Sequence, residues 1–423
     1  MFKGLHMRFP PDVIHSRVLG FGILAATTSA GAGAAGSSDH ATILKLGAGG
    51  AQASFAYDIN ENGAVTGTLR DGALAAAFRW SKTDGIDVLD RPELEVPARG
   101  TAIGETGVVI GSGPRTAADL IPTLFRWAAG QRELEVLGEP ATLEGAIGRG
   151  LLADDSIVGL VLGPGGLTRE QAFILDDEFQ PLSSAPSGAT ASAGHDAAGW
   201  RIAEDHHVQG VRWSIGAQGI DEQYLEGPPW SQGEGVNDAG DVVGMALGPA
   251  GPTAYVWRSD EPVVEFLLDG PHATRSIAYD INAAGDVVGA AETVDGRRAF
   301  LWTPDDGFID LNSLLSPEDA GDWTLTQARA INDAGAITGF GLFSADGKAL
   351  PVFRGFLMTL PTVAACNAAD IAEPFGILDG ADVNAFINAF GTGGDAADIA
   401  DPAGVIDGAD VNAFINAFGA GCP

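Results

Sequence analysis

The segment Ala278–Trp302 has an order of apolar and polar positions that recurs along most of this 423-residue chain. It reads AYDINAAGDVVGAAETVDGRRAFLW, with a short apolar run ending in Asn282, a turn ending in Gly285 and a β-branched run ending in Gly289. Asn at the first and Gly at the fourth position are typical of a type I turn, and short β-branched runs favour strands. The pattern therefore predicts short antiparallel strands joined by tight turns.

Six other parts of the chain are imperfect copies of this segment. The glycines that end the second strand lie 44 residues apart at Gly67 and Gly111, and 45 apart at Gly244 and Gly289. A period near 45 residues is that of a four-stranded propeller blade. Two copies, near 154–175 and 196–213, are degenerate, so six or eight blades stay open beside seven. The sequence predicts an all-β fold, a β-propeller of about seven four-stranded blades over residues 41–360.

The two ends of the repeat array predict how the ring closes. The segment Ala41–Leu46 has the pattern of an outer strand and precedes the first turn, whereas the seventh repeat ends at 355–360 without one. An N-terminal strand that completed the last blade would remove an open sheet edge. We expect this shared closing blade.

The charge and the N-terminus narrow the location and the partners. With 56 Asp and Glu against 23 Lys and Arg, the net charge of −33 disfavours nucleic acid and anionic lipid. Basic residues, an apolar run at 18–26 and small residues beyond it predict a signal peptide over 1–35, with a disordered cytosolic tail as the alternative. No other apolar run approaches the length that spans a bilayer. We expect a secreted protein, extracellular or attached to a cell surface.

After a linker at 361–365, a second domain of two near-identical halves covers residues 366–423. Residues 370–390 recur as 398–418, and each half ends in apolar residues at helical spacing, such as Val383, Phe386, Ile387 and Phe390. Acidic residues precede each helix: Asp370, Glu373, Asp379 and Asp382, then Asp398, Asp401, Asp407 and Asp410. Grouped carboxylates suit Ca²⁺, although helix N-caps and solvated loop residues are the simpler interpretation.

The only cysteines, Cys366 and Cys422, bracket this domain. In an exported protein such a pair favours a disulfide over a redox or metal site. Closing the loop would stabilise the fold by roughly 4 kcal/mol on the chain-entropy model.

Two resemblances accompany these patterns. The I-N-x-x-G, V-V-G and A-F-x-W order is similar to the extracellular HAF-repeat family, although Arg298 and Ala76 replace its His. That resemblance implies a secreted propeller without an established reaction. The acidic loops resemble dockerins, and most closely the GC-type dockerin-like domains of bacterial planctomycete proteins, which implies Ca²⁺ and a cohesin-like partner. The loops depart from dockerins by one extra residue, with Phe375 or Ala403 where an oxygen ligand is expected.

Candidate chemistry outside the tail is sparse. H-E-x-x-H, G-x-S-x-G and P-loop motifs are missing from the sequence, and the segment Asp205-His206-His207 supplies too few ligands for a metal. Acids paired across a propeller channel could serve glycoside hydrolysis, but the sequence identifies no pair. Five tryptophans at one repeat position are expected to pack between blades: Trp80, Trp127, Trp213, Trp257 and Trp302. Trp230 is interpreted as a buried loop anchor, with a sugar-stacking platform as the alternative.

These patterns predict a non-catalytic propeller for binding or display, attached through the calcium-dependent tail to a cohesin-type partner or surface. The alternative is an extracellular carbohydrate-active enzyme, a glycoside hydrolase or lyase with a polysaccharide substrate. A structural surface protein is the third interpretation. We expect function where copies depart from the repeat, around 200–230, and in the acidic tail.

Overall fold

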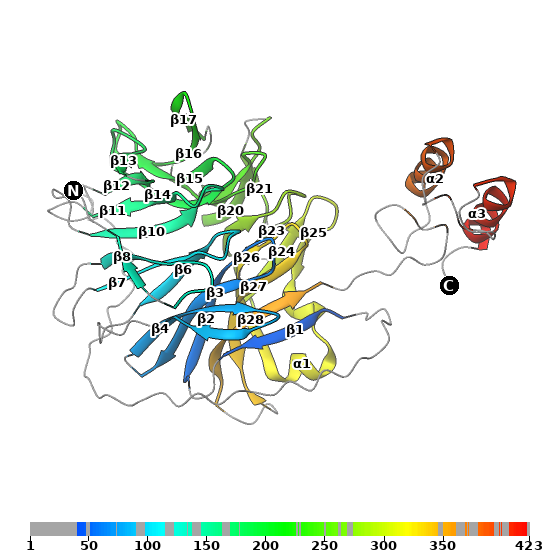
Figure 1. The fold of residues 1–423 in the computed structure, drawn as a ribbon, viewed down its shortest axis with the longest axis horizontal. Helices are drawn as coiled ribbons and strands as arrows, with labels where there is room; N and C mark the ends of the chain where they lie inside the picture. The colour runs from blue at the N-terminus through cyan, green and yellow to red at the C-terminus, as the bar shows by residue number, and fades with distance from the viewer. Residues whose placement is uncertain are drawn as a thin grey trace. The chain divides into compact units, whose positions relative to one another are not determined.

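The computed structural model shows a β-propeller of seven four-stranded antiparallel sheets, followed by two helices (Figure 1). The residues it describes are 40–360 and parts of 369–420, with these gaps: 48–50, 73, 90–97, 115–121, 133, 138–144, 163–169, 177, 226, 228–229, 249–250, 261–263, 269–273, 346–349, 361–368, 370, 372–379, 393–396, 398, 400 and 401–405. In that part of the chain, no helix is long and apolar enough to cross a membrane.

The first four blades follow the chain, and in each the first strand is innermost and the fourth outermost. Blade 1 contains β2 (Ala53–Ile59), β3 (Val65–Asp71), β4 (Leu74–Ser81) and β5 (Gly85–Val88). Blade 2 contains β6 (Arg99–Ile103), β7 (Val109–Pro114), β8 (Pro122–Trp127) and β9 (Leu134–Val136). Blade 3 contains β10 (Ala146–Leu151), β11 (Ile157–Val161), β12 (Gln171–Leu175) and β13 (Phe179–Pro181). Blade 4 contains β14 (Ser187–Ala193), β15 (Asp196–Ile202), β16 (Val208–Gly216) and β17 (Gly219–Tyr224).

The remaining three blades complete the ring. Blade 5 contains β18 (Ser231–Val236), β19 (Val242–Gly248), β20 (Gly251–Trp257) and β21 (Val264–Phe266). Blade 6 contains β22 (Arg275–Ile281), β23 (Val287–Thr293), β24 (Gly296–Thr303) and β25 (Gly307–Asp310). Two short helices, η3 (Leu311–Leu314) and α1 (Pro317–Asp322), lead into β26 (Trp323–Ile331), β27 (Ala336–Phe343) and β28 (Val352–Thr359) of blade 7. The prediction of seven blades is thus confirmed, and the two degenerate copies are blades 3 and 4.

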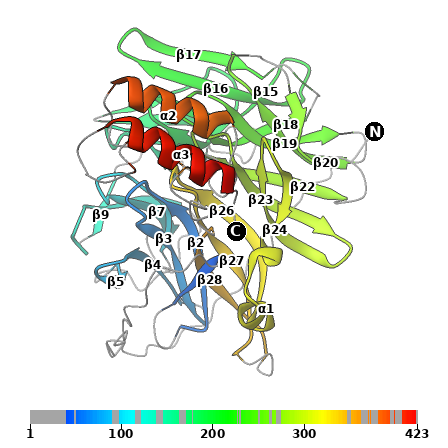
Figure 2. The ribbon, with the colours of Figure 1, turned by 90° about the vertical axis from the view of Figure 1, so that its right-hand side faces the viewer.

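The N-terminal strand closes the ring. Strand β1 (Thr42–Leu46) pairs with β28 as the outer strand of blade 7, so the two ends of the repeat array share one sheet. The blue β1 beside the orange β28 shows this pairing (Figures 1 and 2). Leu46 is only 1% exposed and packs with Phe78 of blade 1. This pairing of β1 with β28 confirms the predicted shared blade. Each sheet buries its faces only against its neighbours, so closing the ring also buries the outer faces of the first and last blades.

The hydrophobic core lies between consecutive blades. Trp257 is fully buried and packs with Ala198 of blade 4, and Trp213 packs with Val158 of blade 3. Trp127 and Trp302 also belong to clusters that join two blades, and Trp80 packs at the edge of the cluster of blades 1 and 7. The interpretation of the repeated tryptophans as packing residues is confirmed.

The recurrent Asn residues close turns and also link blades. In the turn after β22, Gly285 N–H donates to the Asn282 carbonyl at 3.1 Å, and Gly285 has φ +85°. The Asn side chains reach further: Asn282 Nδ2 donates to the Asn332 carbonyl of blade 7, at 3.4 Å, and Asn332 Nδ2 donates to the Asn60 carbonyl of blade 1, at 3.1 Å. Asn60 and Asn237 make the same bond to the next blade. The Asn residues therefore hold the ring together as well as ending the strands.

The C-terminal unit contains α2 (Gly380–Thr392) and α3 (Gly408–Ala420), which pack through equivalent residues. The rings of Phe386 and Phe414 stack with centroids 4.2 Å apart, and both residues are 5% exposed. The predicted apolar face is only partly buried, since Ile387 is 60% and Ile415 is 59% exposed. Each helix thus buries its first Phe and leaves its Ile in solvent.

Candidate binding site in the axial channel

A β-bulge occurs at the same place in each of the seven innermost strands. In β2 the register with β3 shifts between Ala56 and Asp58, which leaves Tyr57 as the extra residue. The equivalent residues are Tyr57, Thr101, Arg149, Thr190, Glu234, Tyr279 and Arg329. All seven line one cavity of about 450 Å³ along the propeller axis. A bulge redirects a side chain, so the fold presents seven repeat-specific side chains to one channel.

Small residues before each bulge position explain why the inner strands approach so closely. The residue before the bulge is Ala or Gly in every blade, as in Gly100, Gly148 and Ala278. A Cβ at Gly100 would lie 2.5 Å from Thr66 Oγ1 of blade 1, and one at Gly148 would lie 2.6 Å from Leu124 Cδ1 of blade 2. The recurrent small residue therefore serves blade packing, while the residue after it is free to vary.

Arginines surround the one acidic side chain among the bulge residues. Burial raises the pKa of Glu234, and the nearby Arg329 and Arg149 oppose that rise. Arg149 lies deep in the channel, although water in the channel still reaches its side chain. Desolvation lowers the pKa of Arg149; Glu234 opposes this change, and Arg329 and Arg99 reinforce it. The Glu234 carboxylate accepts a hydrogen bond from Gln232 Nε2 at 2.7 Å.

The two tyrosines are held by neighbouring side chains. The Arg329 guanidinium lies 3.9 Å from the ring centroid of Tyr279, and Arg297 donates to the Tyr279 hydroxyl at 3.1 Å. The ring of Tyr57 lies 6.2 Å from that of Phe340, edge to face. Aromatic faces and guanidinium groups therefore share the wall of the channel.

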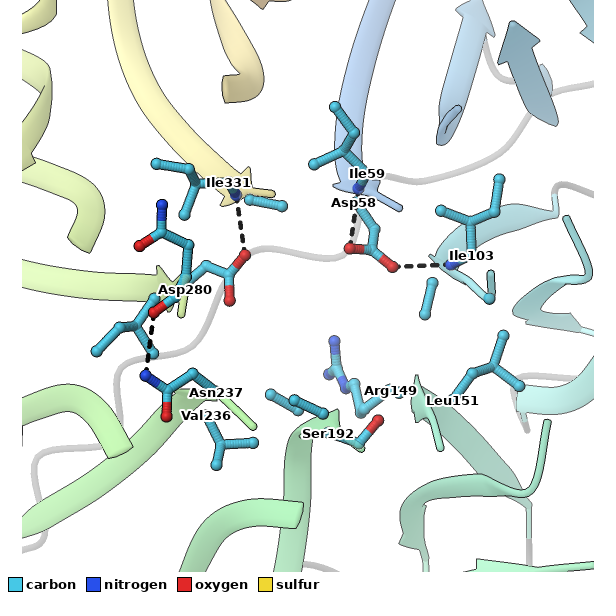
Figure 3. A pocket seen from close by; sticks show the side chains of 18 of the residues that line it. Asp58, Ile59, Ile103, Arg149, Leu151, Ser192, Val236, Asn237, Asp280 and Ile331 are labelled. Atoms are coloured by element: carbon cyan, nitrogen blue, oxygen red, sulfur yellow. Dashed lines mark hydrogen bonds between the residues drawn. The ribbon is translucent and has the colours of Figure 1, made fainter. Parts of the chain in front are cut away.

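Two further carboxylates next to the bulges hold blades together. Asp58 accepts the backbone N–H of Ile59 at 2.9 Å and of Ile103 in blade 2 at 2.8 Å, and Asp280 accepts that of Ile331 in blade 7 at 2.9 Å (Figure 3). Burial raises the pKa of Asp58 to about 7 and that of Asp280 to about 8. Their backbone bonds make them structural groups.

Acidic residues line one mouth of the channel, in the turns that follow the inner strands. Glu61, Glu105 and Asp333 accept backbone N–H groups of neighbouring turns, and Asp238 lies at the same rim. Burial raises the pKa of Glu61, and repulsion from Asp333 and Glu105 adds to the rise. The mouth is therefore acidic, whereas Arg149 and Arg329 lie deeper.

The segment 200–230, where function was also expected, contains a turn with two histidines. The imidazole Nδ1 of His207 contacts the Asp205 carboxylate, and His206 has φ +68° in the same turn. Among the described residues, no group of three or more His, Cys, Asp or Glu is arranged to hold a metal. The interpretation of Trp230 as a buried anchor is wrong, because the side chain directly before β18 is 55% exposed. The channel itself takes one residue from each blade, including Thr190 and Glu234 on either side of this region.

Only some of the predicted Ca²⁺ ligands belong to the described part of the chain. Asp370, Glu373, Asp379, Asp398, Asp401, Cys366 and Cys422 lie outside the described residues, as does the side chain of Asp382. Asp407 accepts the N–H of Ala409, at 2.6 Å, and Asp410, 1% exposed, accepts those of Ile399 and Asp407. These bonds fit the N-cap interpretation, and the carboxylate chemistry also fits a hard cation. Calcium and the disulfide stay predictions.

Comparisons with known proteins find distant structural neighbours. No family model and no curated protein matches the chain. Among solved structures, a streptogramin B lyase is 11% identical, with 76% of this chain and 98% of that chain covered and a TM-score of 0.45. The propeller domain of the Trilobed protease from Pyrococcus furiosus is 15% identical (60% and 80% covered, TM-score 0.46), and a prolyl endopeptidase is 10% identical (76% and 50% covered, TM-score 0.49). The resemblances to HAF-repeat proteins and dockerins stay predictions.

Proposed function

We propose that the propeller is a non-catalytic binding module whose ligand site is the axial channel. The observation that carries this proposal is the ring of seven bulge residues, which differ from blade to blade while the residues before them stay small. A position that served only the scaffold would repeat with the scaffold. Varied polar side chains converging on one concave site are what a small-ligand site requires.

The hydrogen bonding of the acids supports binding over hydrolysis. Glycoside hydrolysis needs two carboxyl groups free to act as acid and base or nucleophile. Asp58, Asp280 and most rim acids instead accept backbone N–H groups, and Glu234 lies among arginines. This arrangement favours a site that holds a ligand without cleaving it.

The C-terminal unit is proposed to attach the propeller to a partner. The duplicated helices with their paired Phe386 and Phe414 support a dockerin-like module that binds Ca²⁺ in its acidic loops, with Cys366 and Cys422 as its disulfide. A cohesin-like protein or a surface component of the bacterial envelope would be its partner. Secretion through residues 1–35 belongs to the same proposal.

A paired screen tests the binding function. The purified full-length protein is mixed with small organic acids, amino acids, sugars and polysaccharides, and both thermal shift and product release are measured. We expect stabilisation by a small ligand without turnover. Turnover of a polysaccharide that is lost when Glu234 is changed to Gln would instead establish the carbohydrate-active enzyme.

A further inference from the structure

Arg99, Arg149 and Arg329 in the channel have no ion-pair partner among the described residues, in contrast to several arginines of the outer strands. On the blades, Arg212 pairs with Asp196 at 2.9 Å, Arg79 with Asp87 at 3.2 Å and Arg258 with Asp241 at 3.0 Å. Acidic residues outnumber basic ones 56 to 23, so carboxylates are abundant. The channel arginines are therefore unpaired because of where the fold places them.

The atoms of these arginines are available for a ligand. Arg149 and Arg99 make no hydrogen bond within the described chain, and the buried Arg329 Nε has no partner. Arg149 points into the open part of the channel (Figure 3). Like charges that are partly desolvated in one cavity repel each other and lower the stability of the fold. Such a loss of stability is typical of functional sites. A guanidinium presents a planar pair of donors that matches a carboxylate.

The rim sets a second requirement on the ligand. Glu61 and Asp333 follow the bulge residues of their strands by four positions and lie in the turns beyond the strand ends, so the chain between them spans at most about 13 Å at about 3.3 Å per residue. Glu105 and Asp238 lie at the same mouth. A simple anion would be repelled there, whereas a cationic group would be attracted. The arginines in the channel therefore attract an anionic group, and the acidic residues at the mouth attract a cationic group.

We propose that the channel binds a small zwitterion, with its carboxylate at Arg149 and Arg329 and its amine at the acidic rim. This inference rests on the proposed binding function and names the ligand class of that site. Tyr279 and Tyr57 supply aromatic surface for the apolar segment between the two charges.

Isothermal titration of the full-length protein with 6-aminohexanoate, hexanoate and hexylamine tests the inference. A charge-assisted hydrogen bond contributes enough for about a tenfold change in affinity. We therefore expect 6-aminohexanoate to bind about tenfold more tightly than hexanoate, and hexylamine to bind more weakly than both. Equal binding of hexanoate and 6-aminohexanoate would overturn the role of the rim.

Three variants locate the binding. Arg149→Met should weaken 6-aminohexanoate binding about tenfold or more, whereas the control Arg126→Met, which removes the same charge from the exposed pair with Glu135, should leave it unchanged. Asp238→Asn should weaken binding of 6-aminohexanoate but not of hexanoate. Unchanged binding in Arg149→Met overturns the inference. A melting temperature of that variant at or above the wild type is expected, and a marked decrease would instead assign Arg149 a structural role.

The outcomes also separate this inference from the binding function. If another compound binds in the channel and none of the three probes does, the proposed ligand class is wrong, while the proposed binding function is supported. If no compound of the wider screen binds in the channel, the proposed function itself fails.

Discussion

Replacing Asn332 with Ala removes the polar link between the last and the first blade. The side chain is 2% exposed; its Nδ2 donates to the Asn60 carbonyl at 3.1 Å and its Oδ1 accepts the Ala336 N–H at 2.9 Å. The variant keeps the backbone bonds of the turn, including that between Asn332 N–H and the Ala336 carbonyl. The change therefore isolates the side-chain link.

The expected loss follows from the hydrogen bonds that disappear with the side chain. The part-buried Ala336 N–H loses Asn332 Oδ1, whereas the Asn60 carbonyl keeps the Gly63 N–H at 2.9 Å, so the free energy of unfolding should fall by about 1–3 kcal/mol. This is a large fraction of the roughly 5–15 kcal/mol that stabilises a typical domain. Because the link spans 272 residues of chain, its loss should weaken ring closure directly.

Urea unfolding followed by tryptophan fluorescence measures this loss. The control is Asn62→Ala, an exposed Asn in an equivalent turn whose Nδ2 donates to the Glu105 carbonyl at 3.1 Å. We expect the control to change the free energy of unfolding by less than about 0.5 kcal/mol. A loss below that value for Asn332→Ala would refute the idea that the Asn side chains hold the blades together.

Three further predictions concern the scaffold and the tail. Leu46→Ala should lower the free energy of unfolding by about 3 kcal/mol, because the side chain is 1% exposed in the closing blade; a neutral effect in urea unfolding would contradict the role of β1. The pKa of Asp58 is raised to about 7 and that of Asp280 to about 8, so their contribution to stability is full below about pH 4 and is lost as the pH rises through 7 to 8. Melting temperatures should therefore decrease from pH 5 to pH 9, and Asp58→Asn, though less stable overall, should show a shallower decrease; an equal slope would count against this assignment. Chelation of Ca²⁺ should decrease the helical circular dichroism of the tail, and titration of the chelated protein should restore it; identical spectra would leave the acids as N-caps alone.

Much of the scaffold could be predicted because its signals are local. The Asn-x-x-Gly turns, the β-branched runs and the period near 45 residues each reflect contacts within one blade or with the next. The closing strand was predictable for the same reason, since Ala41–Leu46 has the outer-strand pattern that blade 7 lacks.

The channel could not be predicted from one repeat at a time. Arg149, Glu234 and Arg329 lie 85 and 95 residues apart in sequence, and only closure of the ring brings them to one cavity. The usable signal was the single variable residue that follows a recurrent Ala or Gly in each inner strand; when the repeats are aligned by their turns, this variation is easily taken for random divergence between the copies. The exposure of Trp230 and Ile387 likewise depends on neighbours that a periodic pattern does not specify.

We propose that the seven bulge residues form the ligand site of this propeller. A crystal structure of the full-length protein with the most stabilising small ligand of the screen is the decisive experiment for this site. We expect ligand density in the channel, within hydrogen-bond distance of Arg149 or Arg329. Density on the outer strands or on the C-terminal helices, with a channel that holds only water, would contradict it.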